Sequence, residues 1–294
     1  MNNHATAILQ TLAIVTMGSF AGVLAKLSLG QVSPVSFVWL QYAIGGVVLS
    51  GYTFWWRKER LPRNLEWRIW VGIVLLGIGN FTICRVLFLL ALDKIPATTY
   101  VYLVNFAGIV TMLLSMYMLR EHPSPYQLLG AVIAIAGLRI FFQTIPPPNQ
   151  ILGLLFLGIG IIAISATNNV ARKLGMMTAN KISTTMVSTL ALWIGGIPVV
   201  VYGLIADVPP DVGGWRDWSI IALNGVVTIA LGLTVWNYIL KTLRSYEAAI
   251  LASTSVIITA VLAIPILGEK LSFTQLGGVA TMMFGLILVQ MRRP

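Results

Sequence analysis

Long apolar segments separated by short polar joints make up most of the chain. Ten of them reach the roughly 20 residues that a helix needs to cross a hydrocarbon layer of about 30 Å. They lie at residues 5–29, 33–56, 67–92, 96–119, 124–143, 150–173, 181–206, 215–241, 245–267 and 272–291. Prolines gather at the joints between these segments, where helices begin or end. The pattern predicts an all-α integral membrane protein with ten transmembrane helices.

The second half of the chain repeats the first. Residues 119–140 reappear 148 positions later as residues 267–288, with eight of 22 positions identical. The same spacing relates the Trp-Arg-x-Trp segments at 67–70 and 215–218, and a spacing of 147 relates the Lys-Leu pairs at 26–27 and 173–174. Half-length repeats in an apolar chain are typical of secondary transporters, whose substrate site lies between the halves.

Each half carries an odd number of predicted spans, so the second half must enter the membrane from the opposite side. We therefore expect two inverted five-helix repeats around a central cavity, residues 1–143 and 150–294, joined by a proline linker at residues 144–149. The first apolar segment lacks a preceding basic region, which favours a retained span over a cleavable signal peptide.

Basic residues are distributed unevenly over the joints. With a cytoplasmic amino terminus, the cytoplasmic side receives 13 of the 19 Lys and Arg residues. The opposite side carries three acids, Asp207, Asp211 and Asp217, around a single Arg216. Cytoplasmic loops are the basic ones in bacterial inner-membrane proteins. We therefore expect a multi-pass protein of the inner (cytoplasmic) membrane with both termini cytoplasmic.

Composition supports the same class. The chain of 294 residues is 57% hydrophobic and 10% charged, with a mean hydropathy of +0.88, so lipid must surround much of it. Its net charge of +10 is spread between apolar segments, which argues against a nucleic-acid partner. A single cysteine and two distant histidines give no reason to expect a metal or other cofactor. The expected partners are a small-molecule substrate and membrane lipid, and a monomer is expected.

A short motif closes each half. Glutamate ends the fourth and ninth spans, and S-x-x-Q-L-x-G follows it: Glu121, Ser124, Gln127, Leu128, Gly130 and Gly137, and again Glu269, Ser272, Gln275, Leu276, Gly278 and Gly285. With the five-plus-five arrangement, this motif resembles the EamA-type drug/metabolite transporter superfamily. The aromatic inner helices are most similar to the YddG-type exporters of aromatic amino acids. The resemblance implies that spans 1, 3, 4, 6, 8 and 9 surround the cavity, while 5 and 10 brace it.

Polar residues inside the spans are the candidates for a site, because polar atoms in a bilayer need internal partners or water. The third span offers Asn80, Cys84 and Phe88 along one stripe, matched in the eighth by Thr228, Gly232 and Trp236. The stripe either lines a cavity or packs helices together through small and polar side chains. The fourth span adds Thr98, Tyr102 and Asn105, and the ninth adds Tyr246 and Ser253.

Two further candidates carry charge or amide groups. Asn168 precedes the basic pair at 172–173 in the sixth span and could bind a substrate's amino or carboxylate group. Arg85 stands well inside an apolar segment, where it either pairs with a substrate carboxylate, reaches the outer interface, or pairs with Asp93.

The sequence predicts a transporter and gives no reason to expect an enzyme. The middle third of every predicted span lacks Asp and Glu, and Glu247 falls in a first helical turn, which favours facilitated diffusion over proton coupling. We expect alternating-access export of small amphipathic metabolites, with aromatic amino acids favoured as substrates. An exporter of hydrophobic cations or drugs is the alternative. A lipid-modifying membrane enzyme lacks a recognisable nucleophile, base or metal motif.

The charge distribution gives a test of orientation. In a Cys84→Ser background, a cysteine at position 60 should resist an impermeant maleimide applied to intact cells, because that joint is expected inside. A cysteine at position 211 should react. The reverse labelling pattern would contradict the proposed orientation.

Overall fold

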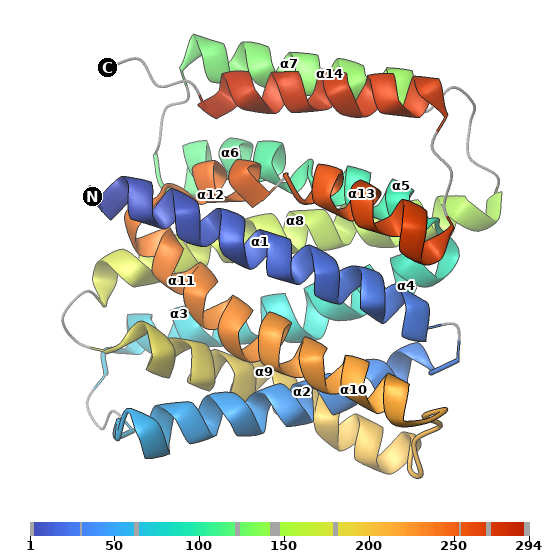
Figure 1. Cartoon of the computed structure of the whole chain (residues 1–294). Helices are drawn as coiled ribbons and strands as arrows, with labels where there is room; N and C mark the ends of the chain where they lie inside the picture. Colours follow the sequence, from blue (N-terminus) through green and yellow to red (C-terminus); the bar gives the residue numbers. More distant parts are fainter. Residues whose placement is uncertain are drawn as a thin grey trace.

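A computed structural model describes residues 3–29, 31–61, 65–120, 124–141, 148–178, 182–252, 254–268 and 272–290, and every regular element in them is a helix (Figure 1). Seven of these helical segments are long and apolar enough to cross a membrane: Thr6–Ser28, Pro34–Trp56, Trp67–Leu92, Thr99–Met118, Gln150–Met177, Thr184–Ala206 and Trp215–Thr242. The start of α1 (Asn3–Ser28) and the end of α14 (Phe273–Gln290) lie at the same end of the bundle (Figure 1). The prediction of an all-helical protein is confirmed for these residues.

Wider π-helical turns interrupt several long segments. Helix α2 (Pro34–Ser50) continues into η1 (Gly51–Trp56). The third predicted span consists of α3 (Trp67–Gly77), η2 (Ile78–Cys84) and α4 (Arg85–Lys94), and the eighth consists of α10 (Trp215–Asn224), η3 (Gly225–Leu231) and α11 (Gly232–Thr242). The turns η2 and η3 begin 147 residues apart, so the two halves share an irregularity that side-chain patterns do not reveal.

Two predicted spans are each divided into two helices. Residues 96–119 form α5 (Ala97–Val104) and α6 (Ala107–Met118), and residues 245–267 form α12 (Ser245–Ala252) and α13 (Ser255–Leu267). The sequence pattern did not predict these two breaks. The Asn105 side-chain amide donates to the Val101 carbonyl, the acceptor that a regular helix would offer to its backbone. The polar side chain thus competes with the helical hydrogen bond.

The remaining helices are α7 (Pro125–Phe141), α8 (Pro148–Met177) and α9 (Thr184–Ala206). The motif shared by the two halves has a local structural role at the starts of α7 and α14. Gln127 Oε1 accepts from the Ser124 backbone amide at 2.7 Å, and Gln275 Oε1 accepts from that of Ser272 at 2.9 Å. Each serine hydroxyl accepts from its glutamine's backbone amide in return, which is the reciprocal capping box. Glu121 and Glu269 lie outside the described residues.

The motif glycines allow α7 and α14 to pack with their backbones in close approach, as the paired helices in Figure 1 show. A Cβ on Gly137 would lie 2.8 Å from the Gly278 carbonyl oxygen, and one on Gly285 would lie 2.5 Å from that of Gly130. Small residues at such positions are the usual means of close helix association in lipid. The motif therefore specifies helix starts and helix packing, and it carries little information about substrate.

A second set of close approaches lies in the centre of the bundle. A Cβ on Gly45 of α2 would lie 2.6 Å from the Gly225 carbonyl oxygen of η3. A Cβ on Gly195 of α9 would lie 2.0 Å from the Gly77 carbonyl oxygen of α3. Each contact joins the second span of one half to the third span of the other half.

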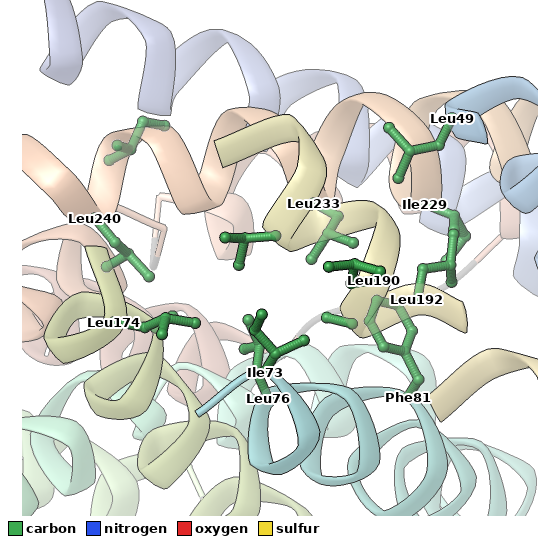
Figure 2. Packing of buried hydrophobic residues seen from close by; sticks show 14 of the residues in the cluster. Leu49, Ile73, Leu76, Phe81, Leu174, Leu190, Leu192, Ile229, Leu233 and Leu240 are labelled. Atoms are coloured by element: carbon green, nitrogen blue, oxygen red, sulfur yellow. The ribbon is translucent and has the colours of Figure 1, made fainter. Parts of the chain in front are cut away.

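The largest group of buried apolar side chains surrounds these contacts. Figure 2 shows side chains from α2, α3, η2, α8, α9 and α11 pointing toward one another, among them Ile73, Leu76, Leu190, Leu233 and Leu240. Ile73 and Leu240 are completely buried. Both halves supply this core, so neither half buries its inner face alone.

The outer surface is apolar, as expected for contact with lipid. Val47 is 74% exposed and Ile205 is 80% exposed. Trp55, Trp67 and Trp215 lie near segment ends and are also strongly exposed, which fits the interfacial position of aromatic residues.

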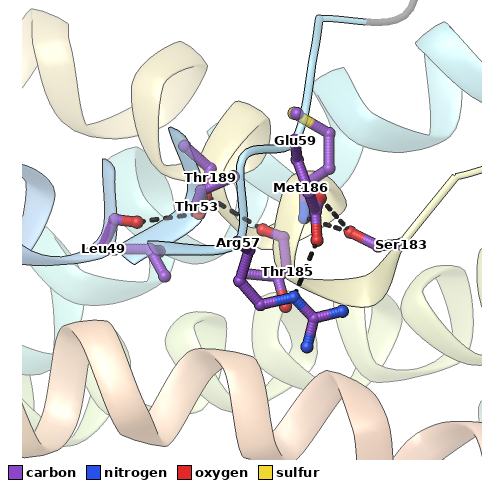
Figure 3. A network of polar contacts seen from close by, with 8 residues as sticks. All are labelled: Leu49, Thr53, Arg57, Glu59, Ser183, Thr185, Met186 and Thr189. Carbon is purple, nitrogen blue, oxygen red and sulfur yellow. Dashed lines mark hydrogen bonds and ion pairs between the residues drawn. The ribbon is translucent and has the colours of Figure 1, made fainter. Parts of the chain in front are cut away.

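A polar network joins η1 and the residues that follow it to the beginning of α9 (Figure 3). The Thr53 and Thr189 hydroxyls lie 2.7 Å apart, and both residues are fully buried. The Ser183 hydroxyl donates to Glu59, whose carboxylate also pairs with Arg57 at 3.1 Å. The network is a second set of contacts between the halves.

The close approach of α9 and α3 makes a stability prediction. Gly195→Ala should lower the free energy of unfolding by about 1–3 kcal/mol, because a Cβ there overlaps backbone that cannot move independently. Gly158→Ala is the matched control, since a Cβ at Gly158 meets no atom within 4 Å. Thermal unfolding of the detergent-solubilised protein measures both, and equal midpoints would contradict the assigned packing.

Candidate functional site

A cavity of about 340 Å³ lies within the bundle, lined by residues of α1, α2, α4, α5, α10, η3, α12 and α13. The lining residues of α1 all belong to its second half, beginning at Val15. The cavity therefore lies toward the end of the bundle opposite the amino terminus. A volume of this size suits a small metabolite. Both halves of the chain contribute to the lining.

Arg85 reaches the cavity at the point where η2 ends and α4 begins. Its Nη2 donates to Gln41 Oε1 on α2 at 3.1 Å. Gln41 is completely buried, and its Nε2 has no hydrogen-bond partner among the described residues. A buried donor without a partner costs free energy unless a ligand satisfies it. The pair therefore presents a guanidinium and an amide donor to the cavity.

The charged side chains described in the lining, Lys26 and Arg85, are both cationic. Lys26 Nζ donates to the Leu92 carbonyl at a long 3.4 Å. A cation removed from water is costly unless an opposite charge accompanies it. The lining therefore favours a ligand with an anionic group.

Aromatic rings form another part of the lining. Phe88 and Tyr100 meet edge to face with their ring centroids 5.8 Å apart, and Phe37 lies in the same lining. Rings in this arrangement can pack against an apolar or aromatic body. The cavity therefore combines cationic and aromatic surfaces.

The polar residues in the lining are not equally available. Asn224 Nδ2 donates to the Ala21 and Ile220 carbonyls at 3.0 and 3.1 Å, and the Thr228 hydroxyl donates to the Asn224 carbonyl at 2.6 Å. The bond to Ala21 joins α10 to α1, and the other two lie within the segment formed by α10 and η3. Ser19 differs, because its buried hydroxyl has no partner among the described residues.

Among the residues that the sequence suggested, Arg85, Phe88 and Thr228 line the cavity directly. Asn105 lies behind it, since its Oδ1 accepts from Ser255, a lining residue, at 3.4 Å. Cys84 is buried outside the lining, and the partly buried Asn80 also lies outside it.

Other suggested residues take part in helix packing away from the cavity. The Tyr102 ring stacks on Phe141 of α7 with centroids 4.0 Å apart and planes within 9°. Trp236 Nε1 donates to Asn168 Oδ1 at 3.0 Å, joining α11 to α8. The side chains of Thr98 and Tyr246, together with Ser253, lie outside the described part of the structure. The side chains of Asp93 and Glu247 also lie outside the described part of the structure.

Most lining residues were missing from the sequence-based candidates, among them Ser19, Lys26, Gln41 and Tyr100. Gln41 had a recognisable signal, since an amide in the middle of an apolar segment needs an internal partner. Lys26 was attributed to the repeat alone. Tyr100 lies two positions from Tyr102, and the two rings face different ways: Tyr100 lines the cavity, whereas Tyr102 stacks on Phe141 of α7.

The described residues contain no group of three or more His, Cys, Asp or Glu side chains that could hold a metal ion. The lining supplies donors for hydrogen bonds and apolar surface. This chemistry suits reversible binding of a solute.

The family model of EamA-like transporters matches residues 5–143 and again residues 151–291. The chain belongs to the EamA-like transporter family. The prediction of a multi-pass membrane transporter with this resemblance is thereby confirmed, whereas an aromatic amino-acid substrate stays a prediction.

Two relatives of this EamA-like transporter are also named as transporters. The chain is 21% identical to an uncharacterized transporter of Archaeoglobus fulgidus over 95% of this chain and 96% of that one. It is 24% identical to an S-adenosylmethionine/S-adenosylhomocysteine transporter of Chlamydia trachomatis over 82% of this chain and 74% of that one. A crystal structure with 17% sequence identity has a TM-score of 0.76 over 97% of this chain and 98% of that chain, which shows a shared fold.

The contact between α8 and α11 gives a prediction about Asn168 and Trp236. In a double-mutant cycle with Asn168→Ala and Trp236→Phe, the coupling in unfolding free energy should be about 0.5–1.5 kcal/mol, the usual net value of a hydrogen bond. Thermal unfolding of the four proteins measures it. Strictly additive effects would contradict the hydrogen bond.

Proposed function

We propose that this EamA-like transporter exports small metabolites that carry a carboxylate and an apolar or aromatic body, with aromatic amino acids as the favoured class. The observation that carries the proposal is the Arg85–Gln41 pair in a cavity whose described charged residues are cationic. A guanidinium binds a carboxylate through two parallel hydrogen bonds, and the free Gln41 amide donor lies beside it. Phe88 and Tyr100 supply surface for the body of the substrate.

The proposed architecture is two inverted five-helix repeats, residues 1–143 and 150–294, joined through residues 144–149. The glycine contacts, Gly45 with Gly225 and Gly195 with Gly77, support it. So does the shared position of the π-helical turns η2 and η3. The two segments that match the family model fall on either side of the proposed linker.

The proposed mechanism is alternating access, in which a bound solute is exposed first on one side and then on the other. The cavity is lined by α4, by α13 and by the second half of α1, which supports a cavity toward the side opposite the amino terminus. On the amino-terminal side, Trp236 bonds to Asn168 and Arg172 donates to the Leu240 carbonyl at 3.4 Å. Breaking those contacts would open the other side.

Facilitated diffusion is the proposed energetic mode. The described lining offers cations and amides, with no Asp or Glu side chain to carry a proton across. We also propose a monomer in the inner membrane with both termini cytoplasmic, which the basic joints and the shared end of α1 and α14 support.

Two rival substrate classes can be weighed against the same cavity. Hydrophobic cations fit poorly, because Lys26 and Arg85 would repel them. S-adenosylmethionine and S-adenosylhomocysteine, named for the Chlamydia relative, carry an amino-acid carboxylate and an aromatic base. They form the second candidate class, since the Arg85 contact and the aromatic lining could hold both ends.

Transport by purified protein in proteoliposomes tests the proposal. Phenylalanine should be transported and phenylalanine amide, which lacks the carboxylate, should be transported poorly. Arg85→Gln should weaken phenylalanine binding by about 1.5–3 kcal/mol, or roughly 10- to 100-fold, because a charge-assisted hydrogen bond is lost. Arg68→Gln, a loss of the same charge at an exposed position of α3, should leave transport unchanged.

Three further conditions complete the experiment. An imposed pH gradient should not drive accumulation, since facilitated diffusion is expected. Competition with S-adenosylmethionine and with a hydrophobic cation separates the rival classes. Equal transport of phenylalanine and its amide by the wild type and by Arg85→Gln would refute the carboxylate site.

A further inference from the structure

The face of α1 toward the cavity carries two glycines, Gly18 and Gly22, spaced by one helical turn. A Cβ on either one would meet no heavy atom within 4 Å. They therefore differ from the central glycines of the bundle, which are required by backbone contact. Here the missing side chains leave empty space inside the cavity.

The second half of the chain has side chains at the corresponding positions. Counting 147 residues on from Gly18 and Gly22 reaches Ser165 and Asn169 of α8. Ser165 Oγ donates to the Ala107 carbonyl of α6 at 3.1 Å, and Asn169 Nδ2 donates to the Thr111 carbonyl at 3.2 Å. Both residues are completely buried, so these side chains close the space between α8 and α6.

The helix facing α1 is the counterpart of α6. Positions 148 residues after Ala107 and Thr111 are Ser255 and Thr259 of α13, and both line the cavity. Helix α1 thus faces α13 as α8 faces α6. Ser165 and Asn169 of α8 close the interface between α8 and α6. The interface between α1 and α13 is open, because Gly18 and Gly22 stand at the corresponding positions of α1.

Independent features of the open interface point to a ligand. Ser19 Oγ and Gln41 Nε2 belong to the same lining, and both side chains are more than nine-tenths buried. Neither atom has a hydrogen-bond partner among the described residues. The space left by the glycines therefore adjoins buried polar groups whose hydrogen bonds the described residues do not satisfy.

We propose that Gly18 and Gly22 determine the largest substrate that the cavity accepts, by leaving room for the apolar body of the solute between α1 and α13. The inference rests on the proposed function for the identity of the solute. The steric part stands on geometry alone: side chains at these positions, such as those present in α8, fill the space between the two helices.

Substitution with the residues found in α8 gives the most direct test. Gly18→Ser and Gly22→Asn should reduce proteoliposome transport of tryptophan and phenylalanine at least tenfold, while transport of alanine changes less than twofold. Gly22→Ala should fall between Gly22→Asn and the wild type. Gly158→Asn is the matched control, because Gly158 is an exposed glycine of α8 with equally open surroundings. Size-exclusion chromatography shows that each variant is folded.

A second measurement does not depend on any substrate. Cysteine placed at Ser255, in a Cys84→Ser background, should react with a small methanethiosulfonate reagent in all variants. Its reaction with a bulky aromatic maleimide should slow at least tenfold in Gly22→Asn and remain unchanged in Gly158→Asn. If no carboxylate compound is transported even by the wild type, this labelling difference still supports the steric role and the proposed function alone fails. Unchanged maleimide labelling in Gly22→Asn, or equal losses for alanine and tryptophan, would overturn the inference.

Discussion

The close approach of backbones at Gly45 and Gly225 is the constraint on which the candidate site depends. A Cβ on Gly225 would lie 2.9 Å from the Gln41 backbone carbonyl oxygen, so the glycine contact fixes the part of α2 that carries Gln41. Gln41 then accepts from Arg85, which begins α4. Van der Waals packing and hydrogen bonding replace the hydrophobic effect as the source of helix association in lipid. Small residues in the middle of the bundle therefore position a cation several residues away.

Much of the fold was accessible from the sequence because its signals are long. Apolar segments of more than 20 residues, the proline joints and the half-length repeat identified a helical membrane transporter. The divided helices and π-helical turns were missed, because they are local changes that leave the apolar pattern unaltered; the break after α5, for example, lies where the Asn105 side chain competes for a backbone acceptor. The motif that identified the family turned out to cap and pack α7 and α14.

The site was less accessible for a different reason. A helix that is apolar on all sides does not show which face is turned inward. Tyr100 and Tyr102 differ by two positions, yet one faces the cavity and the other stacks on Phe141. Arg85 was identifiable because a charge inside a span demands a partner. Its pairing with Gln41 could be found only by bringing α2 beside α4.

The cationic lining of the cavity adds no charge to what transport carries across the membrane. Lys26 and Arg85 are fixed to the protein, so the charge that crosses the membrane is that of the solute. A zwitterionic amino acid moves no net charge, and the membrane potential neither assists nor opposes it. An organic acid moves one negative charge, for which an interior-negative potential of 100 mV contributes about 2.3 kcal/mol toward the outside. In the function proposed above, the same carboxylate contact can therefore serve electroneutral and electrogenic export, according to whether the solute also bears an ammonium group.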